Sequence, residues 1–430
     1  MDLLKLSGRG QFVPLVVGLV GLPGRGKTVL GHKLQKYLTW TGHRARVFSV
    51  SGYRRKHHDY TGHDFFRADN ENAMEIRKKS HLEAMQDAER WINDGGEIAI
   101  LDGTHSTMAV RQTLHNFFVK QLKCKVLFIE CLIDDKDILE NNIKEITQLS
   151  DDYRHMDTEK ALDDIHQKVK HYLEHYKPIC PKAEISYSYI KFHNAGENIS
   201  VHHLDGPYQT KVLGYLSNFR PLRKTLYFSR HGESEFNLLG RIGGDSDLST
   251  RGHKYAALLA NYFNDLAIPN LQVWTSEKTR TKQTAEEINA PVDNLVPLNE
   301  LNAGICEGLT YEEIQEKFPQ EFAWRDQDKL RYRYPWGESY LDIISRLEPV
   351  LLELEREDNV VVISHQAVLR CILGYFLNTE PDQVPYLKVP LHTIIKLTTV
   401  GYECHVDFIE FKVECVDTYR KRPEVCNTSQ

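Results

Sequence analysis

Two short motifs, Gly21–Thr28 and Arg230–Glu233, constrain this chain more than any other feature of its sequence. Each follows an apolar run that predicts a β-strand, Val13–Val20 before the first motif and Lys224–Ser229 before the second. Residues that follow a strand directly lie at the carboxyl edge of an α/β sheet, where such folds bind ligands. The sequence therefore predicts two α/β units, each with a polar site at that edge.

The length of 430 residues is too great for one ordinary hydrophobic core and indicates two domains. Strand-like and helical stretches alternate, which is typical of parallel sheets covered by helices on both faces. The region from 177 to 220 is less regular, and Pro221 precedes a new strand, so we expect domains at 1–220 and 221–430. The predicted strands are Val13–Val20, Arg46–Val50, Glu97–Leu101, Lys125–Cys131, Tyr187–Phe192, Lys224–Ser229, Leu271–Ser276 and Asn359–Ser364. The predicted helices are Thr28–Trp40, Glu71–Trp91, Asp137–Leu149, Lys160–Tyr176, Tyr208–Leu216, Gly252–Leu266, Glu338–Glu357 and Gln366–Phe376.

Composition argues against several partner classes. The net charge of −6 gives no general attraction to nucleic acid or to an anionic membrane. The longest apolar run, Pro14–Leu22, is about half of the roughly 20 residues that a membrane span needs. The N-terminal residues Met1–Ser7 lack the apolar core of a secretory signal, and the eight cysteines, Cys426 among them, form no CxxC pair. We therefore expect a cytoplasmic protein with free thiols and no membrane or nucleic-acid partner.

The first motif has the spacing GxxxxGK[ST] of a nucleotide-binding loop, and a predicted strand and helix flank it. Its glycines let backbone N–H groups converge on phosphate oxygens at a helix N-terminus. Lys27 would reach the β- and γ-phosphates of ATP, and Thr28 would ligate Mg²⁺. A chance glycine-rich turn is the alternative, and the flanking elements argue against it. The full motif comprises Gly21, Leu22, Pro23, Gly24, Arg25, Gly26, Lys27 and Thr28.

Further polar residues follow the next two predicted strands. Asp102 ends the run Ile98–Leu101, where it could hold the water shell of Mg²⁺ or orient the accepting hydroxyl, and where a simple helix cap is the ordinary alternative. Arg54, Arg55 and Arg77 could bind a sugar phosphate through forked guanidinium contacts, although each one alone also suits a solvated surface.

The second motif places His231 between Arg230 and Gly232 at a strand end. A neutral imidazole is a competent nucleophile for phosphorus near pH 7, and a neighbouring arginine offsets phosphate charge. Arg280 and His365 follow two later strands, and Glu300 could protonate a leaving alkoxide. Each residue also has an ordinary interpretation, a packed core histidine or a solvated glutamate. Their joint order along the chain favours a phosphatase site.

With these motifs the chain resembles the bifunctional 6-phosphofructo-2-kinase/fructose-2,6-bisphosphatase family over nearly its whole length. The second half carries the resemblance through Arg230–Ser234, Gly240–Ser246, Tyr332–Pro335 and Ser364–Ala367. The resemblance implies a P-loop kinase domain followed by a histidine phosphatase domain of the phosphoglycerate-mutase type. It also implies that His231 becomes phosphohistidine, that Glu300 acts as acid and then base, and that four residues bind the 2-phosphate: Arg230, Asn237, Arg280 and His365. The residues implied to hold the sugar and its 6-phosphate are Gly243, Tyr311, Arg325, Lys329, Tyr340, Gln366 and Arg370.

The first half keeps most of the family's kinase residues. Asn142 is implied at the nucleotide, and the implied sugar-binding residues are Arg54, Arg55, Arg77, Thr104, Lys168 and Tyr172. Three basic positions depart from the family pattern: Val110 and Thr147 replace an arginine and a lysine, and Lys168 replaces an arginine. Loss of one charge-assisted contact could cost about 1.5–3 kcal/mol, or one to two powers of ten in rate.

The favoured hypothesis is a homodimeric cytoplasmic enzyme that uses ATP and Mg²⁺ to phosphorylate fructose 6-phosphate at its 2-hydroxyl and also hydrolyses fructose 2,6-bisphosphate. The dimer is implied by the resemblance alone. Two alternatives stay open: a phosphatase with a weakened or vestigial kinase domain, and a sensor that binds both ligands to control a partner. No Arg-Arg-x-Ser phosphorylation site lies near either end of the sequence.

Overall fold

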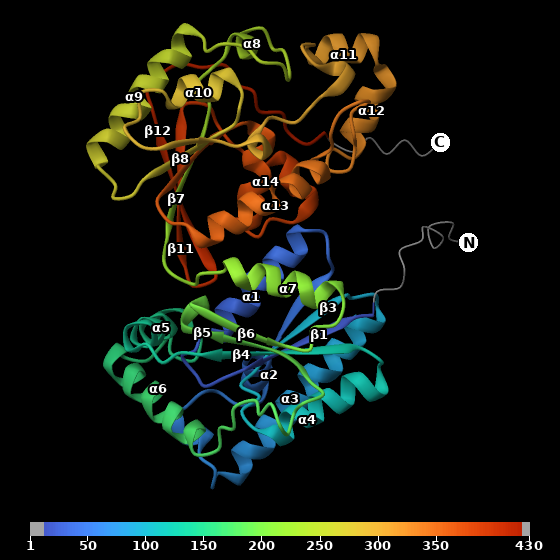
Figure 1. Cartoon of the computed structure of the whole chain (residues 1–430), viewed down its shortest axis with the longest axis vertical. Helices are drawn as coiled ribbons and strands as arrows, with labels where there is room; N and C mark the ends of the chain where they lie inside the picture. Colours follow the sequence, from blue (N-terminus) through green and yellow to red (C-terminus); the bar gives the residue numbers. More distant parts are fainter. Residues whose placement is uncertain (1–12, 424–430) are drawn as a thin grey trace. The chain divides into compact units, whose positions relative to one another are not determined.

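A computed structural model describes residues 13–423, which form two compact units that divide between Leu222 and Arg223. We call the part before this division unit 1 and the part after it unit 2. Each unit has one six-stranded sheet with helices on both faces (Figure 1). The N-terminal segment Met1–Ser7 and Cys426 lie outside the described residues. No helix within residues 13–423 is long and apolar enough to cross a membrane.

Unit 1 alternates strands with helices through most of its length. Its strands are β1 (Leu15–Val20), β2 (Ala45–Ser49), β3 (Ile98–Asp102), β4 (Lys125–Leu132), β5 (Ser188–His193) and β6 (Asn198–His202). Its α-helices are α1 (Lys27–Trp40), α2 (Val50–His57), α3 (Glu71–Asn93), α4 (Met108–His115), α5 (Lys136–Leu149), α6 (Thr158–Leu173) and α7 (Pro207–Asn218). Three shorter helical turns are η2 (His63–Phe66), η3 (Asn116–Gln121) and η4 (Asn194–Gly196).

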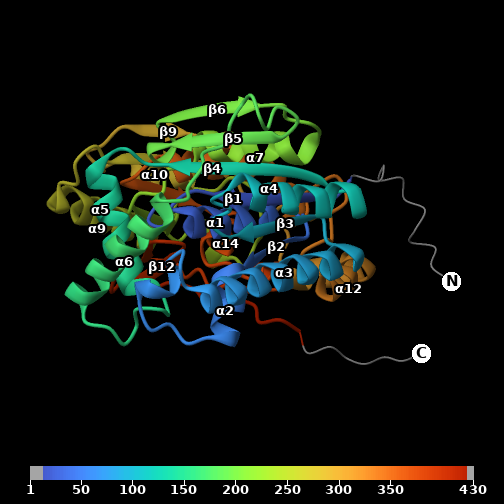
Figure 2. The ribbon, with the colours of Figure 1, turned by 90° about the horizontal axis from the view of Figure 1, so that it is seen from below.

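The sheet of unit 1 has the order β2-β3-β1-β4-β5-β6, which can be followed from the bottom to the top of Figure 2. β1, at its centre, is buried at every residue because it pairs in parallel with both β3 and β4. Helices α1 and α7 cover one face, and α2, α3 and α4 cover the other (Figure 1). The second face packs Ala84, Leu114 and Phe118 against Val16 and other strand residues.

Unit 2 begins with β7 (Thr225–Arg230) in the middle of a second sheet, whose order is β12-β11-β7-β10-β8-β9. Its other strands are β8 (Gln272–Thr275), β9 (Val292–Asn294), β10 (Val360–Ser364), β11 (Thr393–Val400) and β12 (Glu403–Glu410). Its α-helices are α8 (Glu235–Leu238), α9 (Thr250–Leu266), α10 (Thr279–Ala285), α11 (Tyr311–Lys317), α12 (Pro319–Gln327), α13 (Tyr340–Arg356) and α14 (Gln366–Phe376). Its shorter turns are η5 (Val296–Leu298), η6 (Gly304–Cys306) and η7 (Pro381–Tyr386).

The helices of unit 2 also divide between the two faces of its sheet. Tyr255, Leu259 and Phe263 of α9 pack with Tyr227 and other strand residues into one buried cluster. On the other face, the ring of Phe228 lies 6.1 Å from that of Phe376 in α14. Figure 1 shows α9 and α10 on one side of these strands and α13 and α14 on the other.

The α/β architecture is as predicted, but neither sheet is wholly parallel. β6 pairs antiparallel with β5, and β11 pairs antiparallel with both β7 and β12. A short connection explains the β11–β12 pair, since Gly401, with φ of 58°, turns the chain directly from one strand into the other without a crossover helix. Arg54 and Arg55, predicted to follow the second strand, lie within α2, which begins directly after β2.

Candidate active sites

The glycine-rich loop of unit 1 runs from the end of β1 to the start of α1. Gly21, Gly24 and Gly26 have φ of 138°, 80° and 74°, values that side chains disfavour. A Cβ on Gly21 would lie 2.6 Å from the carbonyl oxygen of Cys131. On α5, the Asn142 amide donates to the carbonyl of Gly24 at 3.1 Å and holds the loop. This backbone is shaped to expose N–H groups, as binding of a nucleotide's phosphates requires.

Three side chains meet at the base of this loop. Thr28 donates its hydroxyl proton to Asp102 at the end of β3, at 2.9 Å. Lys27 donates to the carbonyl of Leu22 at 2.7 Å, and burial lowers the pKa of Lys27 to about 8. Burial raises the pKa of Asp102, and the nearby Lys27 ammonium partly offsets this increase. A hydroxyl and a carboxylate side by side are oxygen donors of the kind that Mg²⁺ prefers.

An aromatic cluster, Tyr60, Phe65, Phe66 and Tyr172, lies beside the loop and gathers the candidate sugar-binding residues. Lys168 lies 4.3 Å from the centre of the Phe66 ring, and Arg77 lies 5.9 Å from it. The guanidinium of Arg54 lies 5.1 Å from the Tyr60 ring. Thr104, whose carbonyl accepts from the N–H of Gly21, also donates its hydroxyl proton to Tyr172 at 3.4 Å. The cluster thus joins the cationic residues to the glycine-rich loop.

Two of the cations near this cluster, Arg54 and Arg55, pair with a carboxylate of the protein. Arg54 is 3% exposed, and both Arg54 and Arg55 pair with Asp152, Arg55 at 3.2 Å. Among residues 13–423, one terminal nitrogen of Arg54, Nη1, is buried without a hydrogen-bond partner. Burial lowers the pKa of Lys168 to about 8, while the Asp152 carboxylate opposes that change. A bound anion would satisfy the unpaired nitrogen of Arg54.

Arg111 does not take the place of the arginine that the family pattern has at Val110. Its side chain is 0% exposed and forms two bonds with Glu184, at 2.7 and 2.8 Å. It also donates to the carbonyls of His105 and Lys177, so its role is structural. Thr147 donates to the carbonyl of Lys144 on α5.

In unit 2, parallel pairing aligns the two strand ends that carry the candidate histidines. Ser364 of β10 is in register with Arg230 of β7, and the N–H of His231 donates to the carbonyl of Ser364 at 3.0 Å. The ring centres of His231 and His365 are therefore 5.2 Å apart. Both imidazoles are almost fully buried.

Local hydrogen bonds set which nitrogen of His231 faces the site. Its Nδ1 lies 2.7 Å from the carbonyl of Gly232, which can only accept, so Nδ1 carries the proton. Nε2 is then the atom with a free lone pair. Burial and the nearby guanidinium groups of Arg280 and Arg230 hold the pKa of His231 well below its usual range. The imidazole is thus neutral and nucleophilic at physiological pH.

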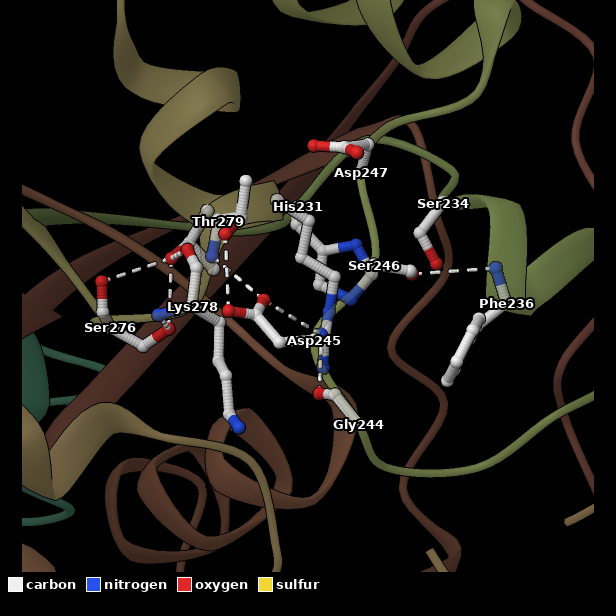
Figure 3. A network of polar contacts seen from close by, with 12 residues as sticks. His231, Ser234, Phe236, Gly244, Asp245, Ser246, Asp247, Ser276, Lys278 and Thr279 are labelled. Atoms are coloured by element: carbon white, nitrogen blue, oxygen red, sulfur yellow. Dashed lines mark hydrogen bonds and ion pairs between the residues drawn. The ribbon is translucent and has the colours of Figure 1, made fainter. Parts of the chain in front are cut away.

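Arg280 of α10 connects His365 to the glycine loop that precedes Asp245. One of its nitrogens donates to Nδ1 of His365 at 3.2 Å, and another donates to the carbonyl of Gly244 at 3.0 Å. Since Nδ1 of His365 accepts, its Nε2 carries the proton and donates to the Ser276 hydroxyl at 2.8 Å. Asp245 accepts from the backbone and the hydroxyl of Thr279, which fixes this loop against α10 beside His231 (Figure 3).

Arg230 and Glu300 complete the group around His231. Arg230 is 4% exposed, and burial lowers its pKa to about 10, with the Glu300 carboxylate opposing that change. The same carboxylate opposes the effect of burial on the pKa of Arg280. Among residues 13–423, the buried Nε of Arg230 has no hydrogen-bond partner. The structure therefore brings residues 230, 231, 280, 300 and 365 together, with a donor left for an anion.

Asn237 and Gly243 lie at the neighbouring loop and short helix. The Asn237 side chain accepts from the N–H of Ser234, and Ser234 accepts in return, which closes the start of α8. Gly243 has φ of 67°, a left-handed value that favours glycine, and a Cβ there would lie 2.1 Å from a carboxylate oxygen of Glu307. The predicted role of either residue in substrate binding stays a prediction.

The remaining predicted residues of unit 2 form a second cationic group. Arg325 donates to the hydroxyls of Tyr334 at 2.7 Å and Tyr311 at 3.0 Å. Arg370 donates to the hydroxyl of Tyr340 at 3.2 Å, and within residues 13–423 its buried Nη2 has no partner. Burial, together with Arg325 and Arg370, lowers the pKa of Lys329 to about 6. Gln366 begins α14, immediately after His365.

Two residues near the end of the described chain were missed by sequence reasoning. Thr418 accepts a hydrogen bond from Arg230 at 2.7 Å, and the guanidinium of Arg420 lies 4.4 Å from the Tyr311 ring. The basic run Arg420, Lys421 and Arg422 was the available signal. Sequence proximity gave no indication that this segment returns to both groups of site residues.

Comparisons with known proteins agree with this division into two sites. The sequence model for 6-phosphofructo-2-kinase matches residues 6–223, and the model for branch 1 of the histidine phosphatase superfamily matches residues 226–411. The chain is 48% identical over 412 residues to the 6-phosphofructo-2-kinase/fructose-2,6-bisphosphatase of Aquarana catesbeiana. This alignment covers 95% of the present chain and 87% of the relative. It is 46% identical over 412 residues to 6-phosphofructo-2-kinase/fructose-2,6-bisphosphatase 1 of Homo sapiens, with 96% and 87% covered. The chain belongs to the 6-phosphofructo-2-kinase/fructose-2,6-bisphosphatase family.

Proposed function

We propose that this chain both makes and hydrolyses fructose 2,6-bisphosphate, with unit 1 as the kinase and unit 2 as the phosphatase. The observation that carries the proposal is the continuous similarity to bifunctional relatives, which spans both units in one alignment of 412 residues. The two sites support it chemically, because one exposes backbone donors to a nucleotide and the other presents a neutral imidazole to phosphorus.

The phosphatase reaction proceeds in two steps. In the first, Nε2 of His231 attacks the phosphorus of the 2-phosphate, the bond from phosphorus to the sugar oxygen breaks, and Glu300 protonates that oxygen. In the second, Glu300 takes a proton from water, which attacks phosphohistidine, and the phosphorus–nitrogen bond breaks to return neutral His231 and phosphate. The buried arginines stabilise the charge that develops on the phosphoryl oxygens.

Binding of the bisphosphate is divided between the two cationic groups of unit 2. The group around His231 holds the 2-phosphate through Arg230, Asn237, Arg280 and His365. The second group holds the sugar and its 6-phosphate through Gly243, Tyr311, Arg325, Lys329, Tyr340, Gln366 and Arg370. Unpaired buried nitrogens on Arg230 and Arg370, one in each group, support this division among the described residues.

The kinase reaction transfers the γ-phosphate of ATP to the 2-hydroxyl of fructose 6-phosphate. Backbone N–H groups of residues 24–28 hold the phosphates, Lys27 neutralises their charge, and Asn142 holds the loop in place. Mg²⁺, held by Thr28 and Asp102, would neutralise charge on the β- and γ-phosphates. The sugar phosphate is held beside the aromatic cluster by Arg54, Arg55, Arg77, Thr104, Lys168 and Tyr172.

A paired assay of both activities on wild type, Lys27→Ala and His231→Ala tests this assignment. Lys27→Ala should lose bisphosphate synthesis and keep hydrolysis, and His231→Ala should form no phosphoenzyme and keep synthesis. Robust synthesis by His231→Ala, where product is not degraded by the normal route, rejects a vestigial kinase. Absence of turnover at both sites would instead favour a sensor. If each substitution lowered synthesis and hydrolysis equally, the assignment of one activity to each unit would be wrong.

We also propose that the enzyme is a cytoplasmic homodimer. Kinship with the bifunctional family supports both points, and the net charge of −6 argues against a general attraction to anionic membranes. Sedimentation equilibrium of the full chain measures the subunit number directly, and a single species of 49.8 kDa would contradict the dimer.

A further inference from the structure

Two imidazoles and a carboxylate converge on the surface of unit 1, outside both proposed sites. His63 and Asp64 begin η2, and His171 lies near the end of α6. Nδ1 of His63 lies 3.1 Å from Nε2 of His171 and 3.7 Å from an oxygen of Asp64. One ligand atom from each residue falls within 4.8 Å of the other two.

The spacing of these atoms suits a transition-metal ion. Two Zn–N bonds of about 2.0–2.1 Å at a tetrahedral angle set the nitrogens about 3.3 Å apart, close to the distance between the two histidines. A hydrogen bond between the imidazoles also explains that distance, but it does not require the Asp64 carboxylate beside them. Two imidazoles with one carboxylate form a donor set that favours zinc and related ions over Mg²⁺ or Ca²⁺.

The surroundings of the three residues are acidic and well fixed. The N–H of His63 donates to the buried carboxylate of Asp164 at 2.6 Å, and Tyr153 donates to the same carboxylate at 3.0 Å. Bonds from Arg67 lower the pKa of Asp69, and the nearby His171 imidazole adds a smaller effect. The nearby cation Arg67 forms two bonds with Asp69, at 2.9 and 2.7 Å, and lies 3.8 Å from Asp64. A divalent cation would therefore meet a favourable potential at a turn that is already positioned.

We propose that His63, His171 and Asp64 form a binding site for Zn²⁺ or a similar ion, with the remaining coordination position open to solvent. Asp64 is 73% exposed and His63 is 32% exposed, which gives an ion access from water. The bound ion cross-links η2 to α6, which side-chain packing and hydrogen bonds otherwise join. We call this cross-link the staple.

Both elements that the staple joins contribute residues to the aromatic cluster. Phe65 and Phe66 belong to η2, and Tyr172 directly follows His171 on α6. The rings of Phe66 and Tyr172 are 5.4 Å apart. If these residues bind fructose 6-phosphate, as the proposed function holds, the ion and the sugar affect each other's affinity equally, as linkage requires. Binding of the ion itself does not depend on that assignment.

Metal binding is tested on the full chain after removal of metal with a chelator. Zn²⁺ is titrated by competition with a chromophoric chelator, and Co²⁺ is titrated by its visible absorption, on wild type, His63→Gln and His171→Gln. The matched control is His166→Gln, an exposed histidine on the same helix. We expect one site in wild type and His166→Gln, and a loss of affinity of at least about a hundredfold in the other two, since even outer partners of a metal ligand contribute 10–100-fold. Equal affinity in all four proteins, or no binding by wild type, would overturn the proposal.

Hydrogen exchange tests the staple separately from both binding and catalysis. Zn²⁺ should slow amide exchange in residues 60–67 of wild type and His166→Gln and leave exchange in His171→Gln unchanged. Binding without this protection would contradict the staple. Because neither measurement requires turnover, failure of the kinase assignment would leave both results interpretable.

Discussion

The two proposed sites differ in how far the polypeptide assembles each one by itself. In unit 2, Arg280 bonds directly to His365, and His365 bonds to Ser276, so site residues hold one another in place. In unit 1, Lys27 bonds to the carbonyl of Leu22, and Arg54 and Arg55 pair with Asp152. The phosphatase residues are thus held partly by one another, whereas Arg54 and Arg55 of the kinase site are held by a carboxylate with which a bound phosphate would compete.

The origin of the side chains explains this difference. His231 and His365 follow adjacent strands of one sheet, and parallel pairing fixes their separation. Lys168 and Tyr172 lie on α6, and Arg54 lies on α2, so their positions depend on how helices pack against a turn. Pairing within the sheet therefore fixes the two histidines directly, whereas the side chains on α2 and α6 are positioned only through packing with the turn η2.

The largest effect should come from a charge that is structural and not catalytic. Arg111→Met removes a fully buried partner of Glu184, and we expect unit 1 to lose about 3–5 kcal/mol of unfolding free energy. Urea unfolding of unit 1, detected by its susceptibility to proteolysis, measures this loss of unfolding free energy. Arg90→Met is the control, since Arg90 is 77% exposed and its pair with Asp87 should contribute less than about 1 kcal/mol. Normal stability with weakened binding of fructose 6-phosphate would give Arg111 the role of the basic residue missing at Val110.

The next effect concerns proton transfer in the prepared site. Glu300→Gln keeps the shape of the side chain but cannot donate or accept the proton, so phosphatase kcat should fall about a hundredfold, or about 2.7 kcal/mol. Kinase activity should be unchanged. Release of phosphate from fructose 2,6-bisphosphate measures the phosphatase kcat. Glu277→Gln, a substitution of an exposed glutamate, is the control. A decrease below about threefold would remove Glu300 from proton transfer.

A smaller effect should separate sugar binding from chemistry in unit 2. Arg325→Lys keeps a positive charge but loses the forked bonds to Tyr311 and Tyr334, so we expect KM to rise about tenfold with little change in kcat. Arg331→Lys, at a 57% exposed arginine, is the matched control. A fall in kcat with unchanged KM would place Arg325 in the chemical step instead.

The smallest effect at neutral pH is a pH dependence of stability in unit 1. Nδ1 of His105 donates to the carbonyl of Leu19, and burial lowers the pKa of His105 to about 3 and that of His81 to about 4. The unfolded chain binds these protons near pH 6.5 and the folded chain does not, so stability falls as pH drops below about 6.5, by about 1.4 kcal/mol per pH unit for each histidine. His105→Asn should flatten this slope by about that amount.

Urea midpoints of unit 1 at pH 5.0 and 7.5 test this slope in wild type and His105→Asn. His155→Asn, at an exposed position of the same unit, should leave the slope unchanged. Equal slopes in all three proteins would show that His105 becomes protonated in the folded state.

Local patterns were sufficient for the α/β class and for most of the helices and strands. The predicted helix Gln366–Phe376 has the bounds observed for α14, and apolar runs located β1, β4, β7 and β10 to within two residues at each end. The hairpin of β11 and β12 was not predicted, although polar and apolar residues alternate from Glu403 to Phe408 and Gly401 precedes them. Alternation over six residues indicates a half-buried strand, but it does not show which strand is its partner or in which direction they pair.

The candidate sites divide in the same way. Residues that follow strands, such as His231 and His365, could be placed together from the sequence because a sheet fixes where its strands end. The bond from Arg111 to Glu184 and the return of Thr418 to Arg230 join residues that are far apart in the sequence. No local pattern encodes such contacts, since they depend on packing of the whole unit.

The central claim is that His231 carries the phosphoryl group during hydrolysis in a site that is ready before substrate binds. Rapid quenching of one turnover, with fructose 2,6-bisphosphate labelled at the 2-phosphate, measures this most directly. We predict transient, acid-labile label on Nε2 of His231 in wild type and in Lys27→Ala, and none in His231→Ala. Label on another residue, or hydrolysis of the bisphosphate by wild type with no label on the protein at any time, would contradict the claim.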